Sequence, residues 1–123
     1  DYKKTLFGSN RVCYHSGKKK TKYSPLEFAK LMEEFGAGEL LLNSIDRDGM
    51  EIGYDTKLIR QVSSSVNLPI IASCGAASHA DLNIGVKAGA SAVAASTIFV
   101  YNGPHKAVLI SYPSERELSQ IFS

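Results

Sequence analysis

The 123-residue sequence contains no tryptophan and has only two cysteines, Cys13 and Cys74, which lie far apart and form no CxxC pair. A metal centre or disulfide framework is therefore not expected, and two free thiols are typical of a reducing cytoplasm. No apolar run approaches the roughly 20 residues that a membrane span requires. The first residues have no apolar stretch behind the basic ones, so we expect no signal peptide. These absences favour a cytoplasmic protein without metal, cofactor or membrane partner.

The composition is that of a folded domain, with 44% hydrophobic and 21% charged residues. At this length we expect one domain over residues 1–123. The chain does not begin with methionine, so we expect it to start inside a longer polypeptide.

Positive charge is concentrated at the N-terminal end. The formal net charge is only +2, yet half of the 14 lysines and arginines lie in the first 23 residues. Such a cluster indicates either a patch for an anionic ligand or a solvated basic loop. Aromatic residues are few among these lysines and no nucleic-acid motif is present, so a nucleic-acid partner is not expected.

Helix-starting signals recur along the chain from residue 24 onward. Ser24, Pro25 and Glu27 have the spacing of an N-cap, a first-turn proline and a capping box, and Gly36 predicts the end of this helix. Asp55 predicts the cap of a second helix. Further helices are expected over residues 79–87 and after Ser114, and strands over residues 11–15, 40–42, 69–72 and 92–95.

Short apolar strands that alternate with helices indicate an α/β fold with a parallel sheet covered on both faces. Three helix–strand repeats suit either a flavodoxin-like sheet or a piece of a (β/α)8 barrel. In both folds the loops after the strands meet at one edge. We therefore expect residues 43–49, residues 73–78 and the chain from residue 96 onward to form one working face.

Several segments carry a family resemblance. Residues 44–49 read SIDRDG and GYD follows at 53–55, LPIIAS at 68–73 precedes a Gly-Ala pair, and YHSGKK occupies 14–19. In this order, and over nearly the whole chain, the sequence resembles the cyclase subunit of imidazole glycerol phosphate synthase. That family is a lyase built as a (β/α)8 TIM-type barrel, which takes ammonia from a glutaminase partner and closes an imidazole ring on a phosphorylated sugar-type substrate.

The resemblance implies that the chain corresponds to the C-terminal half of that barrel. Strands one to four of the family have no counterpart, and with them one of the two catalytic aspartates. A half-barrel leaves strand edges and an apolar interior open, so we expect a homodimer that completes the barrel. Alone, such a half is expected to be inactive.

Two features resemble a paralogous branch found with surface-polysaccharide genes. Residues 98–113 replace the shorter end of the histidine-biosynthetic enzymes, and Asn43 stands where those enzymes usually carry threonine. The branch is thought to work with a glutaminase-like partner to place an acetamidino group on a sugar. We favour this branch over histidine biosynthesis itself.

The resemblance implies roles for three polar side chains. Asp1 aligns with the second catalytic aspartate and would act as a general acid/base, unless it is simply a frayed terminal residue. Asp48 would bind substrate hydroxyls and assist proton transfer, unless Asp48 or Asp46 simply caps the turn before Gly49. Asn43 would donate to substrate in the barrel mouth, or be a satisfied polar group of the core.

A phosphate site is the main binding prediction. Ser73, Gly75 and Ala76 would present backbone N–H groups, with Ala95 and Ser96 completing the site, because small residues after barrel strands let a phosphate approach the backbone. Cys74 replaces a glycine of the family, so its side chain is expected to narrow the pocket or to be strained at a positive φ.

Two other functions remain open on the sequence. One is a non-catalytic phosphate-binding or scaffold half-barrel that homodimerises. The other is a degenerate gene product that folds without chemistry. Binding of a phosphate or sugar phosphate separates the last of these from the rest, and ammonia-dependent turnover separates the enzyme from the scaffold.

Overall fold

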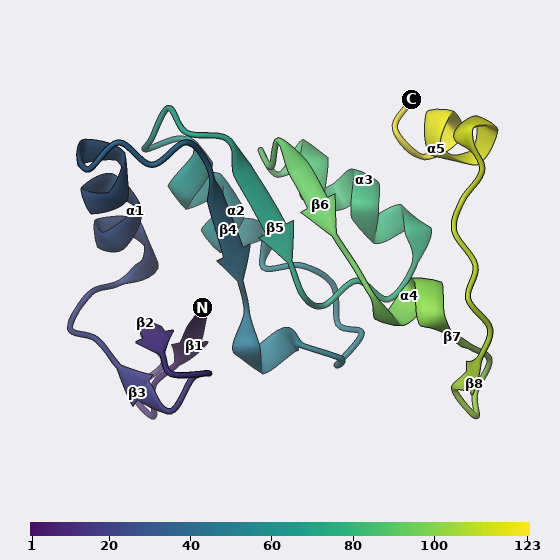
Figure 1. Ribbon diagram of the computed structural model, residues 1–123, viewed down its shortest axis with the longest axis horizontal. Coiled ribbons are helices and arrows are strands. Elements are labelled where there is room, and N and C mark those ends of the chain that lie inside the picture. Colours follow the sequence, from purple (N-terminus) through teal and green to yellow (C-terminus); the bar gives the residue numbers. More distant parts are fainter.

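A three-stranded parallel sheet forms the centre of the fold, in a computed structural model that describes residues 1–123 (Figure 1). Its order is β4 (Leu40–Asn43), β5 (Ile70–Ser73) and β6 (Ala92–Ala94), so each strand pairs with the next along the chain. The strands are joined by α2 (Thr56–Ser63) and α3 (His79–Lys87), and α1 (Pro25–Glu34) precedes them. This sequential order fits part of a (β/α)8 barrel.

The helices cover only one face of this sheet, as Figure 1 shows. Leu42, Ala72 and Val93 lie in register on the helix side and join the core. Leu41, on the opposite face, is 58% exposed. Leu41 pairs in register with Ile71, and Ile71 with Ala92, so one row of apolar side chains has no covering layer. The expectation of a sheet covered on both faces is therefore wrong, because no element of this chain packs on that side.

The predicted helices form at the expected positions because their caps are local. The Ser24 hydroxyl accepts from the Glu27 N–H, and Glu27 Oε2 accepts from the Ser24 N–H at 2.8 Å. The Asp55 carboxylate accepts from Leu58 N at the start of α2. Ser114 caps α5 (Glu115–Ile121) with the same kind of box.

The N-terminal segment folds as an antiparallel ribbon of three strands. These are β1 (Tyr2–Lys4), β2 (Asn10–Tyr14) and β3 (Lys19–Lys20). The strand expected over residues 11–15 is confirmed as β2. Tyr2 also forms a parallel bridge with Ser44 just after β4, and its buried ring anchors the ribbon to the sheet.

Short elements lie after β4 and β6, on the edge where the strands end. The 3-10 helix η1 (Ile45–Arg47) follows β4. After β6 come α4 (Thr97–Val100) and a hairpin of β7 (Tyr101–Asn102) and β8 (Ala107–Val108). An extended segment then leads to α5, which contacts α3 (Figure 1).

Two clusters of buried residues hold the helices against the sheet. One lies between β5, β6, α2 and α3 and is built around Tyr54, Ile59, Ala72, Ala76, Leu82, Ala88 and Ala90. The other lies between α1, α2 and the start of β5 and is built around Tyr2, Ala29, Leu58, Val62, Val66 and Ile70. None of the helices combines the length and the apolar composition that a membrane span requires.

Candidate functional site

A cavity of about 250 Å³ opens where β4, β5 and β6 end. The expected working face is formed here, because parallel strands end at the same edge of a sheet. All the predicted site residues except Asp1 line the cavity; they are Asn43, Asp48, Ser73, Gly75, Ala76, Ala95 and Ser96. Cys74, Gly49, Ala94 and Thr97 complete the wall.

Asp1 joins this site through Asn43. Asn43 Nδ2 donates to Asp1 Oδ1 at 2.9 Å. The following residue, Tyr2, is buried, and the Asp1 carbonyl accepts from Cys13 N at 2.8 Å, so the ribbon supports the chain terminus. Asp1 is therefore held by hydrogen bonds, although it lines a neighbouring cavity with Val12 and Leu41 and not this one.

The side chain of Cys74 lies within hydrogen-bonding distance of both Asn43 and Asp48. The Cys74 thiol donates to Asn43 Oδ1 at 3.1 Å and lies 3.5 Å from Asp48 Oδ1. The side-chain amide of Asn43 thus donates to Asp1 through its N–H and accepts from the thiol through its carbonyl. These two bonds fix the orientation of the amide group. The Asp48 carboxylate accepts from no backbone N–H, so it does not cap the turn before Gly49.

Cys74 shows both properties expected of a side chain at a glycine position. It lines the cavity, and its φ of 72° lies in the left-handed region, which costs a non-glycine residue on the order of 1 kcal/mol. Burial and, to a lesser extent, the Asp48 carboxylate raise the pKa of the thiol, although the Ser73 hydroxyl opposes this. The thiol is thus a hydrogen-bond donor at neutral pH and a poor nucleophile. Sequence reasoning did not find its bonds to Asn43 and Asp48.

Backbone N–H groups on two loops of the cavity are free for a ligand. Those of Gly75, Ala76 and Ser96 donate to no other group of the chain. By contrast, Asp81 Oδ2 accepts from Ala77 N and Ser78 N at 2.9 Å, so the N–H groups of the two residues just before α3 are already satisfied. A cluster of unpaired N–H groups in a small-residue pocket suits an oxyanion such as phosphate.

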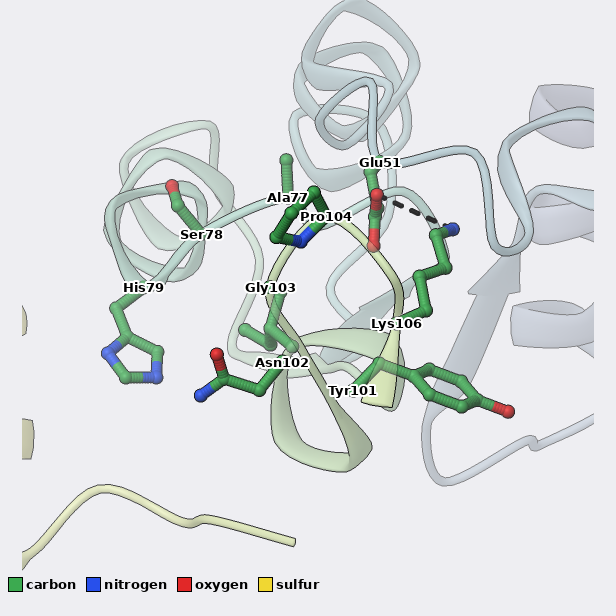
Figure 2. Close-up of a pocket in the computed structure, with 10 residues that line it drawn as sticks. Glu51, Ala77, Ser78, His79, Tyr101, Asn102, Gly103, Pro104 and Lys106 are labelled. Carbon is green, nitrogen blue, oxygen red and sulfur yellow. Dashed lines mark ion pairs between the residues drawn. The ribbon is translucent and has the colours of Figure 1, made fainter. Parts of the chain in front are cut away.

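A second cavity of about 480 Å³ adjoins the first, beneath the β7–β8 hairpin. Figure 2 shows Ser78 and His79 on one side and an ion pair between Glu51 and Lys106, 3.6 Å apart, on the other. The two cavities use neighbouring residues of the same segments, for example Ala76 and Ala77. No local sequence pattern predicts this cavity, because its walls come from segments far apart in the chain.

The described side chains form no group of three or more histidine, cysteine or acidic residues that could hold a metal ion. The chemistry at hand is that of carboxylates, an amide, a thiol and backbone N–H groups. Such a set can bind a phosphate, hold hydroxyl groups and move protons.

Comparisons with known proteins identify the family to which the sequence is similar. The sequence model of a family described as "Histidine biosynthesis protein" matches residues 1–106. A Pseudomonas aeruginosa protein named for imidazole glycerol phosphate synthase subunit hisF2 is 46% identical over 96% of this chain and 47% of its own length. The imidazole glycerol phosphate synthase subunit HisF of Dehalococcoides mccartyi is 52% identical over 74% of this chain and 36% of its own length. The chain spans about half the length of the curated relatives it matches at full coverage.

Proposed function

This chain belongs to the histidine biosynthesis protein family, and on that basis we propose that it acts as the C-terminal half-barrel of an ammonia-accepting cyclase of the imidazole glycerol phosphate synthase type. The observation that carries the proposal is one cavity that gathers all the predicted site residues except Asp1, three of which have unpaired backbone N–H groups. Relatives named as HisF subunits, similar along this chain and twice as long, support the same assignment.

In the proposed reaction the cavity holds one phosphate of a sugar-type substrate. The N–H groups of Gly75, Ala76 and Ser96 donate to the phosphate oxygens, which places the organic part of the substrate toward Asn43. Asp48 then lies beside the cavity with a carboxylate for substrate hydroxyls, and Asp1 lies across Asn43 from it. Addition of ammonia and ring closure both require protons to be moved, and these two carboxylates are the acid/base groups of this half.

A partner is needed for the complete reaction. The uncovered sheet face, with Leu41 58% exposed, is the surface that the remaining part of a barrel would cover. We propose that a second copy, or the missing N-terminal half, packs there, and that a glutaminase subunit supplies the ammonia. The 123 residues alone are expected to give no ammonia-dependent turnover.

Of the two pathways, we propose the acetamidino-sugar branch. The segment that differs from the histidine enzymes forms the β7–β8 hairpin, and this hairpin walls the second cavity beside the site (Figure 2). A longer C-terminal segment that lines a cavity next to the phosphate site is suited to a different substrate.

The second candidate function is a non-catalytic phosphate-binding scaffold that homodimerises. The open apolar row of Leu41, Ile71 and Ala92 favours it, because that row needs a cover whether or not chemistry occurs. Light scattering at two protein concentrations tests the pairing. A species of twice 13.3 kDa supports it, and a monomer at both concentrations contradicts it.

Ribose 5-phosphate and inorganic phosphate together test the site. For Asp48→Asn we expect weaker binding of ribose 5-phosphate and unchanged binding of inorganic phosphate, because Asp48 is assigned to hydroxyl groups. Glu39→Gln, an acidic residue at the opposite end of β4, is the matched control and should change neither. Equal affinities of wild type and Asp48→Asn for the sugar phosphate would remove Asp48 from the site.

A further inference from the structure

The dipeptide Gly53-Tyr54, between η1 and α2, contacts two segments that line the cavity, the loop after β5 and the end of β6. Gly53 N donates to the Gly75 carbonyl at 2.7 Å. The Tyr54 hydroxyl donates to the Ala94 carbonyl at 2.9 Å. Because these residues are consecutive, one short stretch of chain joins the loop after β5 to the last residue of β6.

This connection lies at the end of the β5–β6 ladder, just before the two loops. The ladder between β5 and β6 ends at Ser73 and Ala94. Beyond it no backbone hydrogen bond links residues 74–76 with residues 95–96. The distance between the N–H groups of Gly75 and Ala76 on one side and Ser96 on the other is therefore held by Gly53-Tyr54 and by the loops themselves.

The dipeptide is itself firmly held. Arg47 Nη1 donates to the Gly53 carbonyl at 2.9 Å and lies 3.3 Å from the Ile52 carbonyl. The Tyr54 side chain is only 5% exposed, and a Cβ added at Gly85 would lie 3.1 Å from its ring. Burial raises the pKa of Tyr54 to about 12, so its hydroxyl donates at every pH at which the protein is handled.

The backbone of Gly53 also lies very close to the backbone of Gly75. Its φ is +106°, and a Cβ built on it would overlap the Gly53 carbonyl oxygen and lie 2.9 Å from the Gly53 carbonyl carbon. Only glycine permits this approach. The contact uses the carbonyl of Gly75 and not its N–H, which donates to no other group of the chain.

We propose that Gly53 and Tyr54 are positioning residues, which hold the two N–H-bearing loops at the separation that one phosphate group requires. This inference rests on the proposed phosphate site. Neither residue need touch the ligand, since Gly53 acts through Gly75, and Tyr54 acts through the carbonyl that precedes Ala95 and Ser96.

Tyr54→Phe tests the proposal, with inorganic phosphate as the probe and amide NMR shifts as the readout. Loss of one hydrogen bond in a buried site should weaken phosphate binding about three- to tenfold. In the free protein, the amide signals of Ala95 and Ser96 should move while those of α1 stay in place. Tyr2→Phe is the matched control: it removes another buried hydroxyl, 3.4 Å from Asp55 Oδ2 on the helix side, and should leave phosphate affinity within twofold.

The outcomes are distinct. Wild-type affinity in Tyr54→Phe overturns the positioning role and leaves the phosphate site standing. Equal weakening in Tyr54→Phe and Tyr2→Phe also overturns it, because the effect would then be general loosening. A wild-type chain whose cavity amides do not respond to phosphate overturns both this inference and the proposed function. If Tyr54→Phe fails to fold, Arg47→Lys, which keeps the charge but loses the paired contacts to Ile52 and Gly53, takes its place with the same expected loss.

Discussion

The close approach of Gly75 to Gly53 predicts an unusually costly glycine-to-alanine substitution. Gly75→Ala places a Cβ onto the Gly53 carbonyl oxygen and 3.2 Å from the Cβ of Arg47. The loop must then move, which breaks the 2.7 Å bond from Gly53 N to the Gly75 carbonyl. Gly36→Ala is the matched control, since Gly36 also has a positive φ of +79° but nothing within 4 Å of its added Cβ.

The expected losses in free energy of unfolding follow from the surroundings of Gly75 and Gly36. Both variants pay about 1 kcal/mol for an alanine in a left-handed conformation. Only Gly75→Ala adds about 1–2 kcal/mol of overpacking and about 1 kcal/mol for the lost hydrogen bond. We expect its free energy of unfolding to fall by about 3–4 kcal/mol, against about 1 kcal/mol for Gly36→Ala.

Urea unfolding followed by circular dichroism measures both values. At about 4 °C per kcal/mol for a domain of this size, the melting temperatures should fall by about 12–16 °C and about 4 °C. Equal losses in the two variants would refute the reasoning, because they would leave no cost for the contact with Gly53.

Three further predictions concern single side chains. The backbone N–H and the hydroxyl group of Ser24 lower the pKa of Glu27. The contribution of Glu27 to stability is therefore present above the pKa of the unfolded state and is lost as the pH falls through the lowered value. In Ser24→Ala, NMR titration of the carboxylate should show a higher pKa of Glu27 than in the wild type. Because burial raises the pKa of Cys74, alkylation by iodoacetamide should be slower at pH 8 than for a free thiol and should accelerate only at higher pH; a rate equal to that of free cysteine would contradict this. Lys106→Ala removes an exposed ion pair with Glu51, so urea unfolding should show a loss below about 1 kcal/mol.

Local signals made most of the helices predictable. Ser24, Asp55 and Ser114 lie within three residues of the N–H groups they cap, so the sequence alone carries the whole interaction. The strands over residues 40–42 and 69–72 were recognisable for a similar reason, as apolar runs between turns. Strand β1 was not, because a three-residue strand with two lysines has no pattern, and its pairing with β2 crosses a turn.

The uncovered sheet face shows what an apolar run does not reveal. Leu40, Leu41 and Leu42 read as a strand buried on both sides, but only alternate residues face helices of this chain. Whether Leu41 is covered depends on a partner, and an apolar run is the same whether its cover comes from the same chain or another.

The candidate site also has features that the sequence predicts and features that it does not. Strand-end loops with small residues, together with the family resemblance, gathered Asn43, Ser73 and Gly75 into one predicted region. The bonds from Cys74 to Asn43 and from Tyr54 to Ala94 could not be predicted, since they join residues 31 and 40 positions apart and depend on side-chain distances. These contacts belong to tertiary structure and leave no local signal.

The most direct test of the account is an amide NMR titration of the wild-type chain with inorganic phosphate. We predict saturable shifts at Gly75, Ala76 and Ser96, where the N–H groups are free, and little change at Ala77 and Ser78, whose N–H groups Asp81 already holds. Shifts confined to the basic loop at residues 18–22, with the cavity amides unchanged, would contradict the account and would make that loop the anion-binding surface.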